Sequence, residues 1–328
     1  MTKRIVAINS LIIIILSFLL MIISCNLQES TDVNYRQEMR DFVIKLSDYA
    51  KAKNPGFIII PQNGQELGTN TGDCDGIIYQ SYFRSIDATA REDLFYGYEG
   101  DDIETISSIA DDMVKMCSLY QDFGIEVMTI DYCSSKEKID SSYLRNNRKG
   151  FISFAATARN LDCIPAYPIK PFNENGNAIT SIHSIQNFLY LINGKNYKSK
   201  SEFINSVSAT YYDLVVIDLF HFEELFTKDE ISKLQKKPNG SRRLVVCYLS
   251  IGEAENYRYY WKSEWNSNPP SWLGVENPDW KGNFIVEYWD SEWQNIIYGT
   301  TDSYLDKILE AGYDGAYLDL IDAFEYYE

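Results

Sequence analysis

Short apolar runs of strand length alternate along the chain with longer stretches in which apolar residues recur at helical spacing. The runs are continuous rather than alternating, which is typical of strands covered on both faces in a parallel sheet. The eight predicted strands are Phe57 to Ile60, Tyr82 to Ile86, Ile125 to Ile130, Phe151 to Ala155, Asn187 to Ile192, Leu214 to Ile217, Leu244 to Leu249 and Gly315 to Leu320.

Helical spacing is clearest in three of the intervening stretches. Its carriers are Met39, Phe42, Val43, Leu46 and Ala50, then Ile103, Ile106, Ala110, Met113 and Cys117, and then Leu305, Ile308 and Leu309. Strands that alternate with helices over residues 35–328 predict an α/β fold, a single (β/α)8 TIM barrel. An open, doubly wound sheet is the alternative.

Polar residues gather where the predicted strands end. In a barrel all these ends meet at one mouth, where such enzymes place their chemistry. A single Asp after a strand also serves as an ordinary hydrogen-bonding cap, so it is the convergence that carries the inference. An acidic mouth without basic clamps resembles sugar chemistry, in which two carboxylates share the work. The residues at these ends are Gln62, Asn63, Asp87, Glu92, Asp131, Tyr132, Asp218, Glu253, Glu255, Asp319 and Asp322.

All six tryptophans lie in the long connection between the last two predicted strands. Indole offers a flat apolar face with a hydrogen-bonding edge, and sugar rings stack on such faces. A connection of this length also needs a small core of its own. We expect most of the six to be structural and one or two to line the cleft: Trp261, Trp265, Trp272, Trp280, Trp289 and Trp293.

The first 24 residues read as a secretory signal. Lys3 and Arg4 precede an apolar run from Leu11 to Ile23, and Ser24-Cys25 follows in a pattern that resembles the bacterial lipobox. We therefore expect a signal peptide over residues 1–24, a lipid on Cys25 and a tether over residues 25–34. An uncleaved membrane anchor is the alternative. Both place the rest of the chain outside the cytoplasm, at the cell envelope.

Charge and residue counts exclude several classes of function. The net charge is −17, and removal of residues 1–24, with two basic and no acidic residues, makes it −19. This balance argues against nucleic acid as a partner and suits a cationic one, or simply solubility. The five cysteines beyond Cys25 are too scattered to predict a disulfide framework. His183 and His221 lack a second ligand at helical spacing, so neither a metal nor another cofactor is expected.

Long motifs carry a family resemblance. SIGEAENYRYYW (250–261), WLGVENPDWKGNFIVEYWDSEWQNII (272–297), AGYDGAYLDLIDAFEYY (311–327), NPGFIIIPQNGQEL (54–67) and IDATAREDLFYG (86–97) resemble the endo-α-1,4-polygalactosaminidase family of glycoside hydrolases, family 114. By this resemblance Asp319, in YLDLID, and Glu92, in AREDLF, match the proposed catalytic carboxylates. One would act as general acid and the other as nucleophile or base, and their separation decides between retention and inversion.

The order of these motifs departs from the family. There, the stretches like NFLYLI and LVVIDL come first, YLDLID falls mid-chain, and PQNG, AREDLFYG and FISFAA follow. The change predicts a circular permutation in which residues 163–182 join the ancestral termini and residues 35–53 form the helix that follows Tyr327. The strand from Phe57 should then lie parallel to the strand from Gly315, directly beside it. A fragment of a tandem duplication would instead repeat or lack strands.

The resemblance implies a substrate, an α-linked galactosamine polymer that is partly or wholly unacetylated and therefore cationic. Glu253 and Arg258 could instead pair with each other structurally. A catalytically silent barrel that only binds surface polysaccharide is the alternative function. The residues expected to line the substrate cleft are Gln62, Asn63, Asp131, Tyr132, Asp218, Glu253, Tyr257, Arg258, Trp289 and Asp290.

Overall fold

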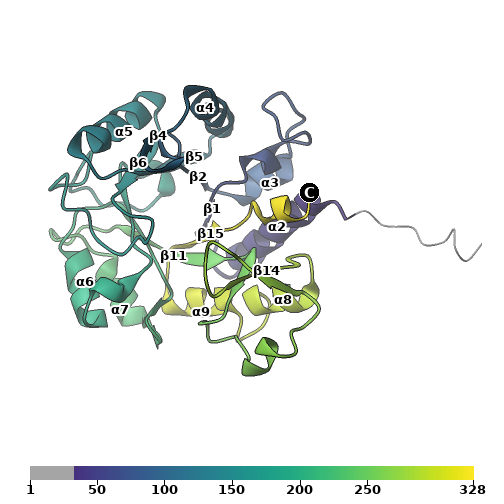
Figure 1. Ribbon diagram of the computed structural model, residues 1–328. Coiled ribbons are helices and arrows are strands. Elements are labelled where there is room, and N and C mark those ends of the chain that lie inside the picture. The colour runs from purple at the N-terminus through teal and green to yellow at the C-terminus, as the bar shows by residue number, and fades with distance from the viewer. Residues whose placement is uncertain (1–32) are drawn as a thin grey trace, which may run out of the picture. The chain divides into compact units, whose positions relative to one another are not determined.

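Eight parallel strands form the centre of the computed structural model, which describes residues 33–328 (Figure 1). Five of them make one sheet in the order β1-β15-β11-β8-β7, and three make a second in the order β2-β5-β6. Every pairing within the two sheets is parallel. Their bounds are β1 (Ile58–Pro61), β2 (Ala88–Glu92), β5 (Glu126–Tyr132), β6 (Ile152–Ala156), β7 (Phe188–Tyr190), β8 (Leu214–Ile217), β11 (Leu244–Ser250) and β15 (Gly315–Asp319).

The two sheets approach each other at both edges. At one, Gln62 forms a parallel bridge with Ala90, and the Asn63 amide donates to the Ala90 carbonyl over 2.8 Å. At the other, the Phe154 ring of β6 lies 5.8 Å from the Phe188 ring of β7. The result is a mixed α/β fold of parallel sheets around an apolar centre.

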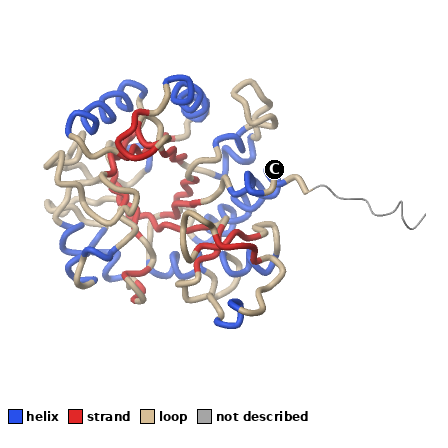
Figure 2. Tube along the Cα trace, viewed as in Figure 1, coloured by secondary structure: helices blue, strands red, loops and turns tan. Residues whose placement is uncertain are grey.

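Helices surround the strands on the outside (Figures 1 and 2). Shorter antiparallel ladders lie in the connections: β3 (Tyr96–Gly97) with β4 (Gly100–Glu104), β9 (Phe220–His221) with β10 (Glu224–Leu225), and β12 (Glu253–Glu255), β14 (Asn283–Val286) and β13 (Leu273–Glu276) in that order. The helices are α2 (Tyr35–Lys53), α3 (Gln80–Ser85), α4 (Ser107–Asp122), α5 (Lys136–Lys149), α6 (Lys200–Ser208), α7 (Lys228–Leu234), α8 (Ser291–Ile297) and α9 (Tyr304–Ala311), with 3-10 turns η1 (Gln65–Gly68), η2 (Ile182–Ser184), η3 (Gly194–Asn196), η4 (Ser263–Asn266) and η5 (Ala323–Tyr326).

Helix α2 confirms the predicted apolar stripe and places it beside the last turn of the chain. All five residues of the stripe are fully buried. At its start, the Tyr35 ring stacks on Tyr327 with centroids 5.1 Å apart, and the Arg36 guanidinium makes a two-pronged ion pair with Glu328. Helix α2 therefore packs where a helix following η5 would begin.

The predicted neighbour of the last strand is also confirmed. Strand β1 pairs with β15 in parallel, Ile58 opposite Gly315 and Pro61 opposite Leu318. Gly315 permits this approach, because a Cβ there would lie 2.4 Å from the Ile58 carbonyl oxygen. Residues 163–182, which were expected to join the ancestral termini, contain no α-helix or strand, and their last residue begins the 3-10 turn η2 (Ile182–Ser184).

One predicted strand is wrong. Tyr82 to Ile86 is mostly helix α3, and the strand begins at Ala88. Tyr82, Phe83 and Ile86 are buried at spacings that also suit one helical face, and Phe83 packs against Tyr120 with centroids 4.6 Å apart. The real strand, ATARE, was overlooked because its buried positions are small or polar. Likewise Ile103 and Ile106 precede α4 and are exposed, because that helix begins at Ser107.

A fully buried ion pair fastens the predicted linker to the sheet. Lys237 Nζ donates to Asp213 over 2.5 Å and to the Asn177 carbonyl over 2.9 Å, and the Asn175 side chain donates to the same aspartate. Asp213 directly precedes β8. The predicted signal peptide, Cys25 and most of the tether lie outside the described residues. Within residues 33–328, no helix is both long and apolar enough to cross a membrane.

Candidate active site

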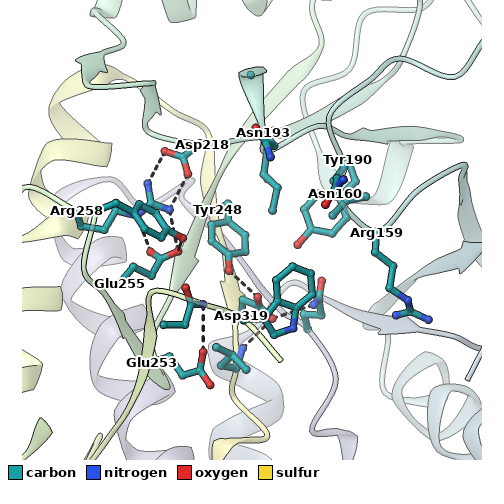
Figure 3. Close-up of a pocket in the computed structure, with 18 of the residues that line it drawn as sticks. Arg159, Asn160, Tyr190, Asn193, Asp218, Tyr248, Glu253, Glu255, Arg258 and Asp319 are labelled. Atoms are coloured by element: carbon teal, nitrogen blue, oxygen red, sulfur yellow. Dashed lines mark hydrogen bonds and ion pairs between the residues drawn. The ribbon is translucent and has the colours of Figure 1, made fainter. Parts of the chain in front are cut away.

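The carboxyl ends of the central strands open into one cavity of about 540 Å³ (Figure 3). Strand β15 ends at Asp319, β2 at Glu92 and β5 at Tyr132, and β1 is followed by Gln62 and Asn63. Parallel strands present their carboxyl ends at the same edge, which brings these side chains together despite their distance in the chain.

Gln62 holds two carboxylates at once. Its side-chain Nε2 donates to Glu92 Oε2 and to Asp319 Oδ1, each over 2.9 Å. Strand β1 lies between β15 and β2, so the residue that follows β1 reaches both neighbours. The two acceptor oxygens are therefore about 6 Å apart at most, twice the length of one hydrogen bond.

Glu92 sits in an environment that favours its protonated form. Burial, with the nearby Asp319 charge, raises the pKa of Glu92 to about 7. The Tyr132 hydroxyl donates to Glu92 Oε1, and the Asn63 amide approaches Oε2 at 3.4 Å. These two donors oppose the rise in pKa but do not cancel it. A carboxyl poised near neutrality suits proton transfer.

Asp319, like Glu92, accepts hydrogen bonds from three donors, of which Gln62 is shared. Burial raises its pKa to about 6, against hydrogen bonds from Tyr248 and from the backbone of Leu320. The Tyr248 hydroxyl donates to Oδ2 over 2.7 Å and the Leu320 N–H donates to Oδ1 over 2.9 Å. Leu320 has a φ of 59°, an uncommon conformation for a residue with a side chain. Burial thus raises the pKa values of both carboxyls toward neutrality, and that of Asp319 remains the lower of the two.

Asp322 is a third carboxylate in the cavity lining. Burial and then the charge of Asp319 raise its pKa to about 8. Within the described chain, no side chain donates a hydrogen bond to it. Asp322 is therefore largely protonated at neutral pH, and a cation placed beside it would favour its charged form.

Arg258 lies between two acidic residues beside this group (Figure 3). Its guanidinium pairs with Asp218 over 2.8 Å and with Glu255 over 2.5 Å. All three side chains are largely buried, and the pKa of Arg258 is raised despite desolvation, because both carboxylates favour its charged form. The predicted alternative pair of Glu253 with Arg258 is wrong. Glu253 instead accepts hydrogen bonds from Asn277, Asn283 and Tyr326.

Most of the residues expected at the cleft lie around the cavity. The lining includes both expected catalytic residues, Asp319 and Glu92, and seven of the ten expected binding residues: Gln62, Asn63, Tyr132, Asp218, Glu253, Tyr257 and Arg258.

Three expected residues lie elsewhere. Asp131 points away from the cavity and is buried, because it accepts hydrogen bonds from the backbone of Phe95 and from the side chains of α5. Trp289 packs against Tyr35 and Tyr327. Asp290 caps α8 by accepting from the Glu292 N–H over 2.7 Å. The prediction that these three residues line the cleft is therefore wrong, and each instead stabilises the fold.

Several lining residues were missed by sequence reasoning. Tyr248 is inside a strand, where it reads as ordinary core, and Arg159 is in an irregular segment after β6. Trp280 was not distinguished from the other tryptophans. Further lining residues of this kind are Asn160, Tyr190, Asn193 and Lys281. As for metals, residues 33–328 hold no group of three or more His, Cys, Asp or Glu side chains arranged to bind one.

Comparison with known proteins finds similarity over part of the chain. Uncharacterized proteins of Methanocaldococcus jannaschii, Thermotoga maritima and Deinococcus radiodurans are 42%, 39% and 40% identical to it over 134, 127 and 122 residues. These alignments cover 40%, 37% and 37% of this chain, and 36%, 36% and 37% of the respective relatives. The chain thus spans little more than a third of the length of these relatives.

A family model matches the second half of the chain. Residues 174–327 match the glycoside-hydrolase family GH114. The matched segment contains β7, β8, β11 and β15 with Asp218, Arg258 and Asp319, whereas Glu92 and Gln62 lie outside it. This part of the chain is therefore similar to a family of glycoside hydrolases.

Proposed function

We propose that the protein hydrolyses an α-linked, galactosamine-containing polysaccharide with Asp319 and Glu92 as its two catalytic carboxylates. The observation that carries the proposal is the shared contact with Gln62, which joins the carboxylate inside the family match to the carboxylate outside it. The family match contains Asp319 but not Glu92, and the contact with Gln62 by itself does not indicate a reaction. Together they support a shared catalytic role for the two carboxylates.

The separation of the carboxylates favours a retaining mechanism. Retaining glycosidases place the two groups about 5–5.5 Å apart, whereas inverting enzymes leave about 6.5–9.5 Å for a water molecule. Because both oxygens accept from the same Gln62 nitrogen, the distance between them is about 6 Å at most. The two N–H bonds of a planar amide point in different directions, which gives an oxygen–oxygen distance of ~5 Å. The carboxylates are therefore close enough for direct attack on the sugar.

In the first step, Asp319 acts as nucleophile and Glu92 as general acid. Asp319, which has the lower pKa of the two, attacks the anomeric carbon as a carboxylate while Glu92 gives its proton to the glycosidic oxygen, and the C–O bond breaks. In the second step, Glu92, now a carboxylate, takes a proton from water as that water attacks the anomeric carbon and releases Asp319. Both residues end in their starting states.

The charge of the cavity supports a cationic sugar. Asp322 lacks a donor among the described side chains, and its elevated pKa reflects repulsion from Asp319 as well as burial. A free ammonium group on a bound hexosamine would offset this repulsion, whereas an N-acetylated or neutral sugar would not. The net charge of −17 acts in the same direction over a longer range.

Release of reducing ends tests the function. The purified protein is incubated with de-N-acetylated α-1,4-linked galactosamine polymer, and a binding assay is run beside it. New reducing ends that keep the α configuration in early NMR spectra are expected. Binding without cleavage would instead favour the catalytically silent, polysaccharide-binding alternative, and β products would contradict retention.

We further propose that the eight strands close into a TIM barrel whose order is circularly permuted. The neighbours of β1 support this, since it lies between β15 and β2, and so does the packing of α2 on η5. The proposal is tested with a rearranged chain in which residues 174–328 come first and residues 35–162 follow. A short Gly-Ser linker joins Glu328 to Tyr35. This chain should fold with the melting temperature and activity of the native order, and a chain that fails to fold contradicts the proposal.

We also propose that Cys25 carries a lipid that holds the enzyme at the cell envelope. The signal-like pattern of residues 1–24 motivates this proposal. Cells grown with an alkyne-labelled palmitate should label the protein, and Cys25→Ser should remove the label. Labelling that persists in the Ser variant would refute the assignment.

A further inference from the structure

Trp280 differs from the other five tryptophans in its surroundings. Trp261, Trp265, Trp272 and Trp293 form one chain of edge-on and tilted ring contacts, with neighbouring centroids 5.2–5.3 Å apart. In contrast, the Trp280 side chain lines the cavity, is 51% exposed, and has no ring contact or hydrogen bond within the described structure. A large apolar face therefore meets solvent at the rim of the site.

The segment that presents Trp280 is held by hydrogen bonds. The Asn283 N–H donates to the Trp280 carbonyl over 3.0 Å, and the Asn256 N–H donates to the Gly282 carbonyl over 2.8 Å. Gly282 has a φ of 94°, which glycine adopts without strain. Below the turn, Glu253 accepts from the side chains of Asn277 and Asn283 over 2.7 and 3.2 Å. The exposure of the indole is therefore built into the turn.

Phe222 is a second exposed aromatic residue of the cavity lining. It lies at the tip of the β9–β10 hairpin, is 64% exposed, and has a φ of 54°. Asn or Gly is favoured where a hairpin turn requires positive φ, and a bulky residue there is strained. The Phe222 ring makes one ring contact, edge-on with His221 at 4.7 Å. Packing of the hairpin thus gives little reason for a phenyl group at this position.

We propose that Trp280 and Phe222 are binding platforms for sugar rings that flank the unit being cleaved. Each offers a flat apolar face at the cavity that holds Asp319 and Glu92, and the C–H faces of pyranose rings stack on such surfaces. The proposal rests on the proposed function and extends it. The ligand is a polymer engaged over several units, so affinity grows with chain length.

Binding in a catalytically silent background tests the platforms. With Asp319→Asn as the parent, we measure the Kd of de-N-acetylated α-1,4-galactosamine oligomers of increasing length. Trp280→Ala should weaken binding of long oligomers about tenfold and leave the shortest bound oligomer within about twofold. Trp280→Phe should recover part of the loss. Val275→Ala, on the same hairpin, 72% exposed and outside the lining, is the matched control and should change nothing.

Phe222→Asn separates stacking from strain. Asn suits the positive φ, so the melting temperature should stay or rise while binding of long oligomers weakens severalfold. If the Trp280 and Phe222 variants bind long oligomers as tightly as their parent does, the proposal of binding platforms is rejected. This holds even if the native protein cleaves the polymer. Loss of length-dependent binding in both variants supports the platforms, even if the native protein shows no hydrolysis. Failure of the parent to bind any oligomer overturns both proposals.

Discussion

Tyr248 donates its phenolic hydrogen to Asp319 Oδ2 over 2.7 Å, from the strand next to the one that ends in this carboxylate. The bond stabilises the anionic form of Asp319, which is the form that the proposed mechanism requires. It is also one of the influences that lower the pKa of Asp319 against the effect of burial. Strand β11 therefore influences the protonation of the carboxyl at the end of β15.

Tyr248→Phe removes this donor. The pKa of Asp319 should rise, so the acidic limb of the kcat/KM profile should move to higher pH, with a loss of about 10- to 100-fold in kcat. The measurement is a pH–rate profile on a soluble oligomer. Tyr317→Phe is the control, because the buried Tyr317 hydroxyl has no partner and its loss should leave activity unchanged. An unshifted profile in Tyr248→Phe would show that the bond does not tune Asp319.

Glu92→Gln and Asp319→Asn should both lose at least about 10³-fold in polymer cleavage, and an activated substrate should separate their roles. A dinitrophenyl α-galactosaminide needs no proton for its leaving group to depart. Glu92→Gln should therefore still release dinitrophenolate in a rapid first turnover, whereas Asp319→Asn should not. Stopped-flow absorbance measures the burst. The opposite pattern would exchange the two roles.

Stability should fall as the pH rises from about 4 to 8. The folded-state pKa values of Asp319, Glu92 and Asp322 are raised to about 6, 7 and 8, from ordinary values of 3.8 for Asp and 4.5 for Glu. The folded state thus binds more protons than the unfolded state in this range, and the free energy of unfolding decreases as those protons are lost. Thermal melts across this range measure the slope.

Asp322→Asn should flatten the upper part of that curve. At pH 8 the variant should be about 1 kcal/mol more stable than the native protein, a reduced value because the cavity admits solvent. At pH 5 the two should be alike, since Asp322 is then protonated. If the stability of Asp322→Asn falls between pH 6 and 8 as steeply as that of the native protein, ionisation of Asp322 is not the cause of the loss.

Lys237→Met should destabilise the fold by about 3–5 kcal/mol, because Asp213 would stay buried without its cation. Urea unfolding measures the change, and the exposed neighbour Lys236→Met should cost less than about 0.5 kcal/mol. Adding Asp213→Asn to Lys237→Met should recover part of the loss, because the buried charge is then absent. A single-variant cost below 1 kcal/mol would mean that the pair does not fasten the linker.

Much of the fold could be read from residue pattern alone. Continuous apolar runs such as LVVI and LVVCYL need cover on both faces, so they predict parallel strands wherever they occur. The stripe of Met39, Phe42 and Leu46 fits only a helix. The pattern does not reveal β2, because Ala88 and Ala90 are too small to form an apolar run. The aromatic residues of α3 resemble such a run and therefore predict a strand where the structure has a helix.

Some features of the candidate site were also predictable from the sequence, and others were not. Sequence determined that Asp319 and Gln62 stand at strand ends, the family resemblance singled out Glu92, and motif order placed β1 beside β15. Only the tertiary structure decided that one Gln62 amide holds both carboxylates, that Asp131 turns into the core, and that Trp280 rather than Trp289 meets the cavity. The physical reason is that strand ends follow from local periodicity, whereas the direction of a side chain depends on packing between segments far apart in the chain.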